Sequence, residues 1–442
     1  MSFPKYPAYK DSGVEWLGEV PEHWSVMAIK RVCAVVGGST PKSDQDAYWD
    51  GDITWVTPAD LSRLTGFEIH DSMRTITAEG LESCGTTIVP EGSVILSTRA
   101  PIGSLGIAAK ALCTNQGCKA LVPNGPSSRL LAYLLTASNE ALNVRGKGTT
   151  FLELSGDELG AFVVPLASVP EQTAIASFLD HETAKIDALV VEQQKLIDLL
   201  QEKRQAVISH AVTKGLNPNV HMKDSGVEWL GEVPEHWDTG TLNRVARRIV
   251  VGIAEAATHA YVDSGVPILR STNIRAGRII GEILHVAPSF AEERGSKEIS
   301  AGDLITVRTG NAGVTAVIPE ELDGCQCFTM LITSLLDDNC GAFYCYWMNG
   351  VAAQHYFALE GWGTAQVNIS VPILKALPVP IPPTDEQAAI VSFLDREIKR
   401  LDDLTSEAES VIRTLQERRT ALISAAVTGQ IDVRNWSVSE SA

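Results

Sequence analysis

The chain has 442 residues, a formal net charge of −18 at pH 7 and a hydrophobic fraction of 45%. This length exceeds what one hydrophobic core usually organises, so we expect two to four domains of a soluble globular protein. The acidic balance argues against a protein that holds DNA unaided, because neutralising phosphates requires clustered Lys and Arg.

Residues 1–24 end in a fifteen-residue segment that the chain repeats letter for letter. KDSGVEWLGEVPEHW runs from Lys10 to Trp24 and again from Lys223 to Trp237. Its Asp-Ser-Gly predicts a turn, and Pro21 excludes a continuous helix. The apolar side chains favour packing onto a neighbouring element over ligand contact. We therefore interpret each copy as a structural clasp.

The first insert, residues 25–165, predicts short strands, turns and one helix. Its strand candidates are β-branched runs bounded by Gly and Pro, at Ile53–Pro58, Thr86–Pro90 and Ser93–Ala100. The best helical pattern is Arg129–Leu142, which places leucines on one face.

Residues 171–213 predict one long helix with a heptad seam of about six repeats, which is typical of a coiled coil. The predicted seam residues are Ile175, Leu179, Ile186, Leu189, Leu196, Leu200 and Val207. Its ends match later segments, because EQTAIASFLD at Glu171 returns as EQAAIVSFLD at Glu386.

The second insert, residues 238–381, has a similar predicted style but a different sequence. Strand candidates are Gly265–Ile274, Gly302–Gly313 and Thr329–Leu336, and Ala342–Gly350 predicts a short helix. The second long helix follows, with the seam Ile390, Leu394, Leu401, Leu404, Val411, Leu415 and Leu422. The two seams match place for place, so the helices can pair with each other.

The predicted fold class is α+β. Two mixed α/β domains lie on a pseudo-two-fold frame of two long antiparallel helices that form a coiled coil. The two halves of such a frame present equal surfaces, and two equal surfaces can hold two copies of one partner. The two unlike inserts would present two different surfaces.

Motifs of independent catalysis are missing from the sequence. GxxxxGK[ST], G-x-S-x-G, HExxH and the deaminase pattern do not occur. Neither do the glycine-rich cofactor turn and the Asn/Asp-Pro-Pro-aromatic loop of an adenine methyltransferase. Cys325 and Cys327 lie in an apolar stretch and predict buried free thiols, not metal ligands. With no signal peptide or membrane-length apolar run, we expect a cytoplasmic location.

The chain resembles the specificity (S) subunits of type I restriction-modification enzymes. The resemblance rests on LGEVPEHW at Leu17 and Leu230, on GGSTPKSDQDAYWDGDITWVTPADL at Gly37–Leu61, and on the paired beginnings and ends of the long helices. It covers essentially the whole chain. The second insert departs from it at its start, because Gly252 is followed by IAEAATHAY in place of the GxTPxxxxxxYW pattern.

The resemblance implies two target-recognition domains separated by two long helices. The implied segments are a first clasp at 1–24, recognition domain 1 at 25–165, long helix 1 at 166–215, a second clasp at 216–237, recognition domain 2 at 238–381, long helix 2 at 382–428 and a tail at 429–442. Each recognition domain would read one half of a bipartite, asymmetric site on double-stranded DNA.

The resemblance also implies partners and cofactors. In such a complex the helices set the gap between the half-sites and dock two methyltransferase (M) subunits, which bind S-adenosylmethionine and methylate adenine N6. Restriction (R) subunits use ATP and Mg for cleavage. The S subunit itself is not an enzyme, binds no cofactor or metal and contacts no membrane. A bacterial or archaeal source is implied.

Candidate DNA contacts are polar residues in turns, since Arg pairs with guanine, Asn and Gln with adenine, and backbone N–H groups with phosphate. They are Thr57, Asp60, Arg99, Asn115, Gln116, Lys147, Thr149 and Thr150 in the first domain and Arg270, Ser271, Asn273, Arg308, Asn311, Thr364 and Gln366 in the second. The alternative for each is a turn residue that satisfies its own backbone.

Two other functions are compatible with the sequence. A pure coiled-coil scaffold would not touch nucleic acid, although two unlike inserts exceed what a scaffold needs. An enzyme with a diverged active site would show turnover without partners.

Overall fold

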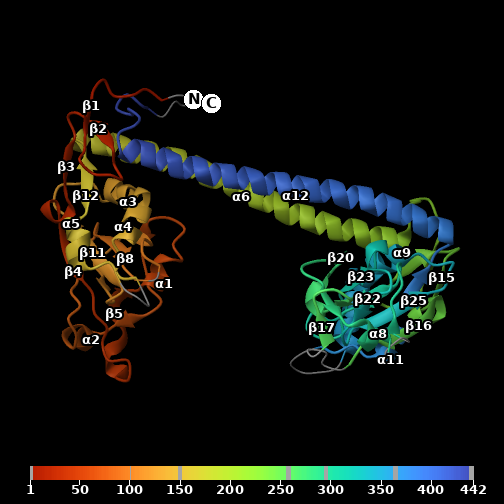
Figure 1. Ribbon diagram of the computed structural model, residues 1–442. Coiled ribbons are helices and arrows are strands. Elements are labelled where there is room, and N and C mark those ends of the chain that lie inside the picture. The colour runs from red at the N-terminus through yellow and green to blue at the C-terminus, as the bar shows by residue number, and fades with distance from the viewer. Residues whose placement is uncertain are drawn as a thin grey trace. The chain divides into compact units, whose positions relative to one another are not determined.

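The computed structural model describes residues 3–99, 101–147, 152–254, 260–292, 297–361 and 367–437. The chain divides into two compact units. Unit 1 comprises residues 1–193 and 410–442, and unit 2 comprises residues 194–409. Both long helices contribute to both units, because the division falls inside each of them (Figure 1).

Unit 1 is built around a five-stranded sheet of order β4-β11-β8-β9-β6 and a three-stranded sheet of order β10-β5-β7. Strands β8 and β9 are continuous runs of apolar and small residues, VILS and LGIA, and are buried along their whole length. The strands are β1 (Tyr9–Asp11), β2 (Glu19–Pro21), β3 (Ser25–Ala28), β4 (Cys33–Gly37), β5 (Trp49–Val56), β6 (Glu68–Ile69), β7 (Thr75–Ile76), β8 (Val94–Ser97), β9 (Leu105–Ala108), β10 (Cys113–Thr114), β11 (Cys118–Pro123) and β12 (Val163–Leu166).

The short helices of unit 1 are α1 (Pro58–Leu61), α2 (Ala78–Glu82), α3 (Ser128–Ala137), α4 (Asn139–Val144) and α5 (Gly156–Ala161). The sequence predicted one helix where α3 and α4 form two. Ser138 separates them as the C-terminal cap of α3. Its hydroxyl donates to the carbonyl of Leu134, a bond of the kind that bends or interrupts helices. The predicted strand at Thr86–Pro90 is wrong, since only Val89 forms an isolated bridge, to Leu112.

Unit 2 has two four-stranded sheets, β16-β25-β22-β23 and β17-β21-β18-β24. Its strands are β13 (Met222–Asp224), β14 (Glu232–Pro234), β15 (Asp238–Thr241), β16 (Ala246–Val251), β17 (Tyr261–Val262), β18 (Val266–Leu269), β19 (Ile274–Arg275), β20 (Arg278–Ile279), β21 (Leu284–Val286), β22 (Leu304–Thr306), β23 (Thr315–Val317), β24 (Gln326–Cys327), β25 (Leu331–Leu335) and β26 (Pro378–Ile381). Its short helices are α7 (Leu242–Val245), α8 (Pro288–Glu292), α9 (Gly341–Met348), α10 (Val351–Glu360) and α11 (Val371–Ala376).

The two units share a plan despite their different inserts. In unit 1, β10 pairs parallel to β5 and β8 pairs with β11 and β9; in unit 2, β24 pairs parallel to β18 and β22 pairs with β25 and β23. Gly38 and Gly252 show the same close approach, because a Cβ on either would lie within 2.4 Å of a carbonyl oxygen on the parallel strand. Unit 2 therefore keeps this close approach although the sequence around Gly252 differs from that around Gly38.

The long helices are α6 (Val169–Lys214) and α12 (Thr384–Val427), both close to the predicted bounds. In unit 1, Arg419 of α12 donates to Asp187 of α6 through Nε at 2.9 Å. In unit 2 the matching pair is Arg204 and Asp402, whose Nε and Oδ1 lie 3.4 Å apart. In each unit the start of one long helix and the end of the other meet the same clasp, at Glu171 and Gly429 in unit 1 and at Glu386 and Gly215 in unit 2, so within each unit the helices run antiparallel, as predicted. Such exposed ion pairs contribute little to stability.

Four of the predicted seam residues are wrong. Leu189, Leu196, Leu404 and Val411 are 51%, 42%, 41% and 38% exposed. The inward positions follow one residue later and again match between the helices: Thr183, Ile186, Val190, Gln193, Ile197 and Leu200 in α6, and Ile398, Leu401, Thr405, Ala408, Ile412 and Leu415 in α12. Both neighbouring stripes are apolar in α6, so spacing alone could not choose between them.

Each clasp anchors a long helix through a glutamate. In unit 1 Trp24 donates to Glu171 at 3.1 Å, and in unit 2 Trp237 donates to Glu386 at 2.9 Å. Both tryptophans are buried. The end of α12 returns to the first clasp, where Tyr9 donates to the carbonyl of Gly429 at 3.0 Å. In each unit the clasp thus contacts and holds the ends of the long helices.

Candidate nucleic-acid interface

In unit 1 the predicted loop residues gather around the end of strand β8. Thr98 receives the N–H of Leu154 at 2.9 Å and donates its own N–H to Gly117 at 2.8 Å. The next turn is attached to β5, because Asn115 donates to the carbonyl of Val56 at 2.9 Å. We call the segment at Glu153 and Leu154, which bonds back to the loop after β8, the returning segment of unit 1. These bonds bring it together with the Asn115 turn and Arg99 at one edge, formed by the ends of strands β5 and β8.

Arg99 and Lys147 lie at this edge with carboxylate partners. Arg99 Nη2 donates to Glu153 Oε1 at 2.9 Å, and Lys147 Nζ donates to Glu158 Oε1 at 2.6 Å. The bond from Lys147 lowers the pKa of Glu158 below its ordinary value. Both cations remain accessible, with 44% and 78% of their side chains exposed. Thr149 and Thr150 lie outside the described residues.

Gln116 and Asn115 occupy one turn but differ in exposure. Gln116 is exposed and accepts a hydrogen bond from the hydroxyl of Thr40. Asn115 is half-buried, and its Oδ1 accepts the N–H of Gly117 at 2.9 Å, which closes the turn. The amide nitrogen of Asn115 is the part of this side chain that this bond does not use.

Thr57 and Asp60 form a helix cap in place of an open polar patch. Asp60 Oδ2 accepts from Thr57 N at 2.8 Å and from Thr57 Oγ1 at 2.6 Å, while its other oxygen accepts from Met73 N at 2.7 Å. Asp60 is 8% exposed. Its oxygens are thus engaged in ordering the loop after β5, which is the structural alternative left open by the sequence.

In unit 2 the same cap recurs with different residues. Asn273 is 2% exposed, and its Oδ1 accepts from Arg270 N at 3.0 Å. Its Nδ2 donates to the carbonyls of Ile280 and Glu282 at 2.9 and 3.0 Å. Asn273 therefore stands where Asp60 stands in unit 1, and Arg270 stands where Thr57 does. Ser271 beside it is exposed.

Replacing Asn273 by Ala should lower the free energy of unfolding by about 1–3 kcal/mol, because it leaves a buried N–H and two carbonyls without their partner. Urea unfolding followed by circular dichroism measures the change. Ser271→Ala is the matched control and should shift stability by less than about 0.5 kcal/mol. Equal losses in the two variants would contradict the cap.

Arg308 and Asn311 lie in the loop after β22. Arg308 is half-buried, its carbonyl accepts the N–H of Ile369 at 3.0 Å, and its Nε donates to Asn368 Oδ1 at 3.0 Å. Asn311 is exposed. Thr364 and Gln366 lie outside the described residues. The edge of unit 2 thus brings together Arg308 and the Asn368 segment, as the edge of unit 1 brings together Arg99 and Glu153.

Sequence reasoning missed Phe328 and Thr329. Phe328 donates its N–H to Leu269 at 3.0 Å, which is the bond that Asn115 makes to Val56 in unit 1. Thr329 has a φ of 43°, in the left-handed region that a β-branched residue rarely adopts. Strain of this kind concentrates at functional sites. Phe328 lies within an apolar run, so the sequence carried no signal for it.

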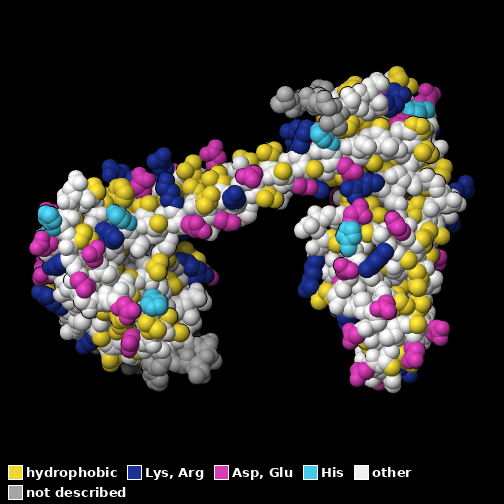
Figure 2. Space-filling view, turned by 180° about the vertical axis from the view of Figure 1, so that it is seen from behind, with side chains coloured by type: hydrophobic (Ala, Val, Ile, Leu, Met, Phe, Trp, Pro, Cys, Tyr) yellow, Lys and Arg dark blue, Asp and Glu magenta, His cyan; other side chains and the backbone are white. Residues whose placement is uncertain are grey.

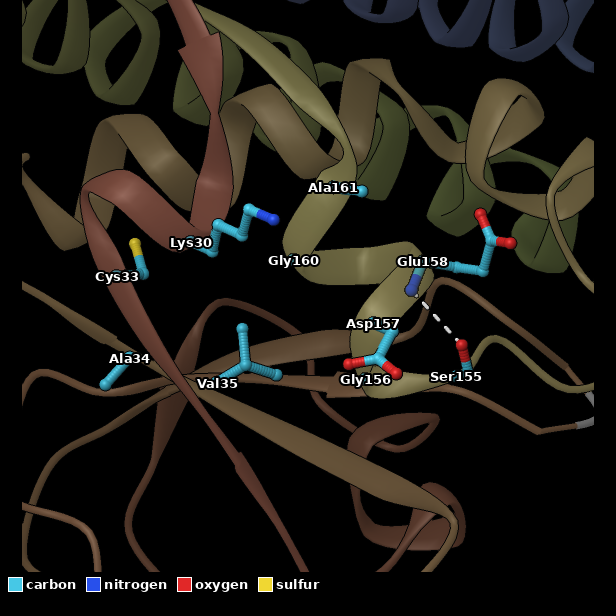
Figure 3. Close-up of a pocket in the computed structure, with 10 residues that line it drawn as sticks. All are labelled: Lys30, Cys33, Ala34, Val35, Ser155, Gly156, Asp157, Glu158, Gly160 and Ala161. Atoms are coloured by element: carbon cyan, nitrogen blue, oxygen red, sulfur yellow. Dashed lines mark hydrogen bonds between the residues drawn. The ribbon is translucent and has the colours of Figure 1, made fainter.

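A hollow of about 710 Å³ lies beside the interface of unit 1, between β4 and α5 (Figure 3). Figure 3 shows Lys30, Asp157 and Glu158 around it, with Ser155 accepting the N–H of Glu158 at 3.1 Å. The charged side chains that line it are of both signs and do not converge on one point. We assign it no ligand, and its relevance is that Glu158 anchors Lys147.

The visible face of each unit mixes acidic and basic side chains (Figure 2). No group of three or more His, Cys, Asp or Glu side chains within the described ranges could hold a metal ion. Cys325 and Cys327 are buried free thiols, as predicted, and burial raises the pKa of each to about 12. Among the same residues no helix is long and apolar enough to cross a membrane.

Two β-rich inserts with a shared strand plan, each followed by one of two matched long helices, define a protein built from tandem repeats. A family model described as "Type I restriction modification DNA specificity domain" matches residues 21–197 and 252–413. These spans cover more than half of the sequence, so the chain belongs to the type I restriction-modification DNA specificity family.

Two relatives with curated descriptions are specificity subunits of type I restriction enzymes, and one of them matches over nearly the whole length of both chains. The chain is 23% identical over 434 residues to the type I restriction enzyme MjaVIII specificity subunit of Methanocaldococcus jannaschii, covering 94% of this chain and 95% of the relative. It is 37% identical over 190 residues to the MjaIX specificity subunit of the same organism, which spans 42% of this chain and only 43% of that relative.

Two solved structures share the fold. A chain from a study of complex assembly and conformational transition of the type I R-M system matches with a TM-score of 0.73 at 15% identity, over 92% of this chain and 98% of that one. The HsdS subunit from Thermoanaerobacter tengcongensis matches with a TM-score of 0.54 at 17% identity, over 93% and 98%. At these identities the likeness concerns the fold.

Proposed function

We propose that this chain is a non-catalytic subunit that reads a bipartite, asymmetric site on double-stranded DNA, one half with each insert. The observation that carries the proposal is a shared loop frame with exchanged side chains. Asn115 in unit 1 is replaced by Phe328 in unit 2, and Thr57 by Arg270, at positions with the same backbone bonds. Phe328 is half-buried against the core of unit 2, whereas Thr57 and Arg270 offer different donors, as side chains that read different base edges do.

The acidic balance implies that partners supply much of the positive field around the duplex. We assign this role to two methyltransferase (M) subunits, which bind S-adenosylmethionine and methylate adenine N6. Restriction (R) subunits would add ATP- and Mg-dependent cleavage. Matched exposed apolar residues on the long helices support paired docking: Leu189 corresponds to Leu404, and Leu196 to Val411. Recurrence of exposed apolar residues at the same two places on both helices is what docking of two copies of one partner would require.

The helices also offer a basis for the gap between half-sites. α6 and α12 are continuous over 46 and 44 residues, and each contributes to both units. A continuous helix resists compression because each residue is fixed by its backbone hydrogen bonds. We therefore assign the spacing of the half-sites to the helix pair.

Footprinting of this chain in complex with its M subunit tests the function. The expected result is protection of two short segments separated by a constant unprotected gap on DNA that carries the target. Absence of protection on all genomic fragments would favour the pure scaffold. Methyl transfer or nuclease turnover by the isolated chain would favour an enzyme.

A further inference from the structure

Two arginines at the interface make one side-chain contact each with a returning segment. In unit 1 Arg99 Nη2 donates to Glu153 Oε1 at 2.9 Å. In unit 2 Arg308 Nε donates to Asn368 Oδ1 at 3.0 Å. Glu153 and Asn368 are equivalent positions, because each is followed by a residue whose N–H bonds to the loop after β8 or β22.

The two arginines are not equivalent positions. Leu154 bonds to the carbonyl of Thr98, whereas its counterpart Ile369 bonds to the carbonyl of Arg308. The isolated bridges agree, since Glu153 opposes Arg99 and Asn368 opposes Thr309. Arg308 therefore occupies the place of Thr98, one residue before the place of Arg99.

Because of this offset, it is notable that the two arginines contact equivalent residues, Glu153 and Asn368. An arginine contact inherited with the repeated frame would recur at the same place on both strands. Here Arg99 and Arg308 start from neighbouring places and converge on the equivalent residue of the returning segment. The returning segment is thus the constant part of the arrangement.

The contact also contributes little to folding. Arg99 and Glu153 are 44% and 39% exposed, and an ion pair this accessible adds well under about 1 kcal/mol to stability. What it does provide is orientation, because a guanidinium held at one nitrogen presents its other donors in a defined plane. The bond to Asn368 uses only Nε of Arg308, and the two terminal nitrogens of a guanidinium are a pair of donors suited to guanine or phosphate.

We propose that Glu153 and Asn368 are positioning residues that aim Arg99 and Arg308 at their DNA contacts. The inference rests on the proposed function and deepens it. The two residues differ in one respect, since the Glu153 carboxylate also compensates the charge of Arg99 while the Asn368 amide leaves that of Arg308 intact. Unit 1 therefore gains less from phosphate attraction at this place than unit 2.

A double-mutant cycle in unit 2 tests the positioning role. The variants Asn368→Ala, Arg308→Ala and the double variant are assayed as complexes with the M subunit on DNA substituted one base pair at a time. Each single variant should lose about tenfold discrimination at the same base pair of one half-site, and the double variant no more. Asn368→Asp keeps an acceptor and should restore most of the discrimination. The other half-site is the internal control.

In unit 1 the charge is tested separately. Glu153→Gln keeps an acceptor for Arg99 but removes the negative charge, so it should tighten binding to non-target DNA and steepen the salt dependence by about one phosphate contact. Glu153→Ala should in addition lose discrimination in the half-site read by unit 1. Unchanged salt dependence in Glu153→Gln would overturn the charge argument.

The outcomes separate this inference from the proposed function. Additive losses from Arg308→Ala and Asn368→Ala, or no loss from either while the complex still binds its target, would overturn the positioning role alone. A wild-type complex without sequence preference would overturn both. Circular dichroism of each variant, together with the internal control half-site, identifies variants that lose discrimination through misfolding.

Discussion

Replacing Trp24 by Ala is expected to lower the free energy of unfolding of unit 1 by about 3–5 kcal/mol. Trp24 is 2% exposed and packs in the core that joins the first insert to both long helices. Its indole N–H donates to Glu171, a carboxylate that is 4% exposed and also accepts from Tyr6 at 2.6 Å. The substitution therefore opens a cavity and removes one donor from a buried charge.

Trp237→Ala should have an effect of similar size on unit 2, where the tryptophan is fully buried and bonded to Glu386. Trp24→Phe is the matched control, because it keeps most of the packing and loses the N–H, for about 1–2 kcal/mol. Guanidinium unfolding followed by far-UV circular dichroism measures all three. A loss below about 1 kcal/mol in Trp24→Ala would show that the clasp does not seat the helix ends.

Lengthening both long helices by one heptad is expected to widen the gap between the recognised half-sites. Seven residues inserted after Gln193 in α6 and seven after Ala408 in α12 preserve the inward positions and add ~10 Å of helix. That length corresponds to about three base pairs of duplex. The measurement is binding of the complex to a series of DNAs that differ only in the number of base pairs between the half-sites.

The matched control places the same seven residues in the segment between Lys214 and Met222, outside the helix. This variant should prefer the original gap, because the helix lengths are unchanged. If the heptad variant also prefers the original gap, the helix pair does not set the spacing.

The repeats allowed most of the fold to be predicted, since matched helix ends and matched clasps leave few arrangements open. In α6 the seam was misplaced by one residue at two positions, because Leu189-Val190 and Leu196-Ile197 offer two adjacent apolar stripes. Only packing in three dimensions distinguishes them. A heptad pattern gives the period of the contact but not its phase when neighbouring positions are both apolar.

The candidate site was predictable at the level of loops and not of side chains. Asp60 and Asn273 have residue types favoured both in caps and in base recognition, so their role depends on neighbours distant in sequence. Arg99 and Arg308 were both candidates from the sequence, and backbone bonds place them one residue apart on the shared frame. Glu153 and Asn368 were not chosen, because their significance lies in a contact with another loop.

The most direct test of sequence reading by the inserts is to place a second copy of residues 25–165 in the position of residues 238–381. Both inserts follow the same fifteen-residue clasp, so the junction is conserved. N6-methyladenine is then mapped by single-molecule sequencing of DNA from cells that express this chain with its M subunit. The wild-type chain should give one asymmetric bipartite motif, and the duplicated chain an inverted repeat of one of its halves. Methylation at the original motif, unchanged by the exchange, would contradict sequence reading by the inserts.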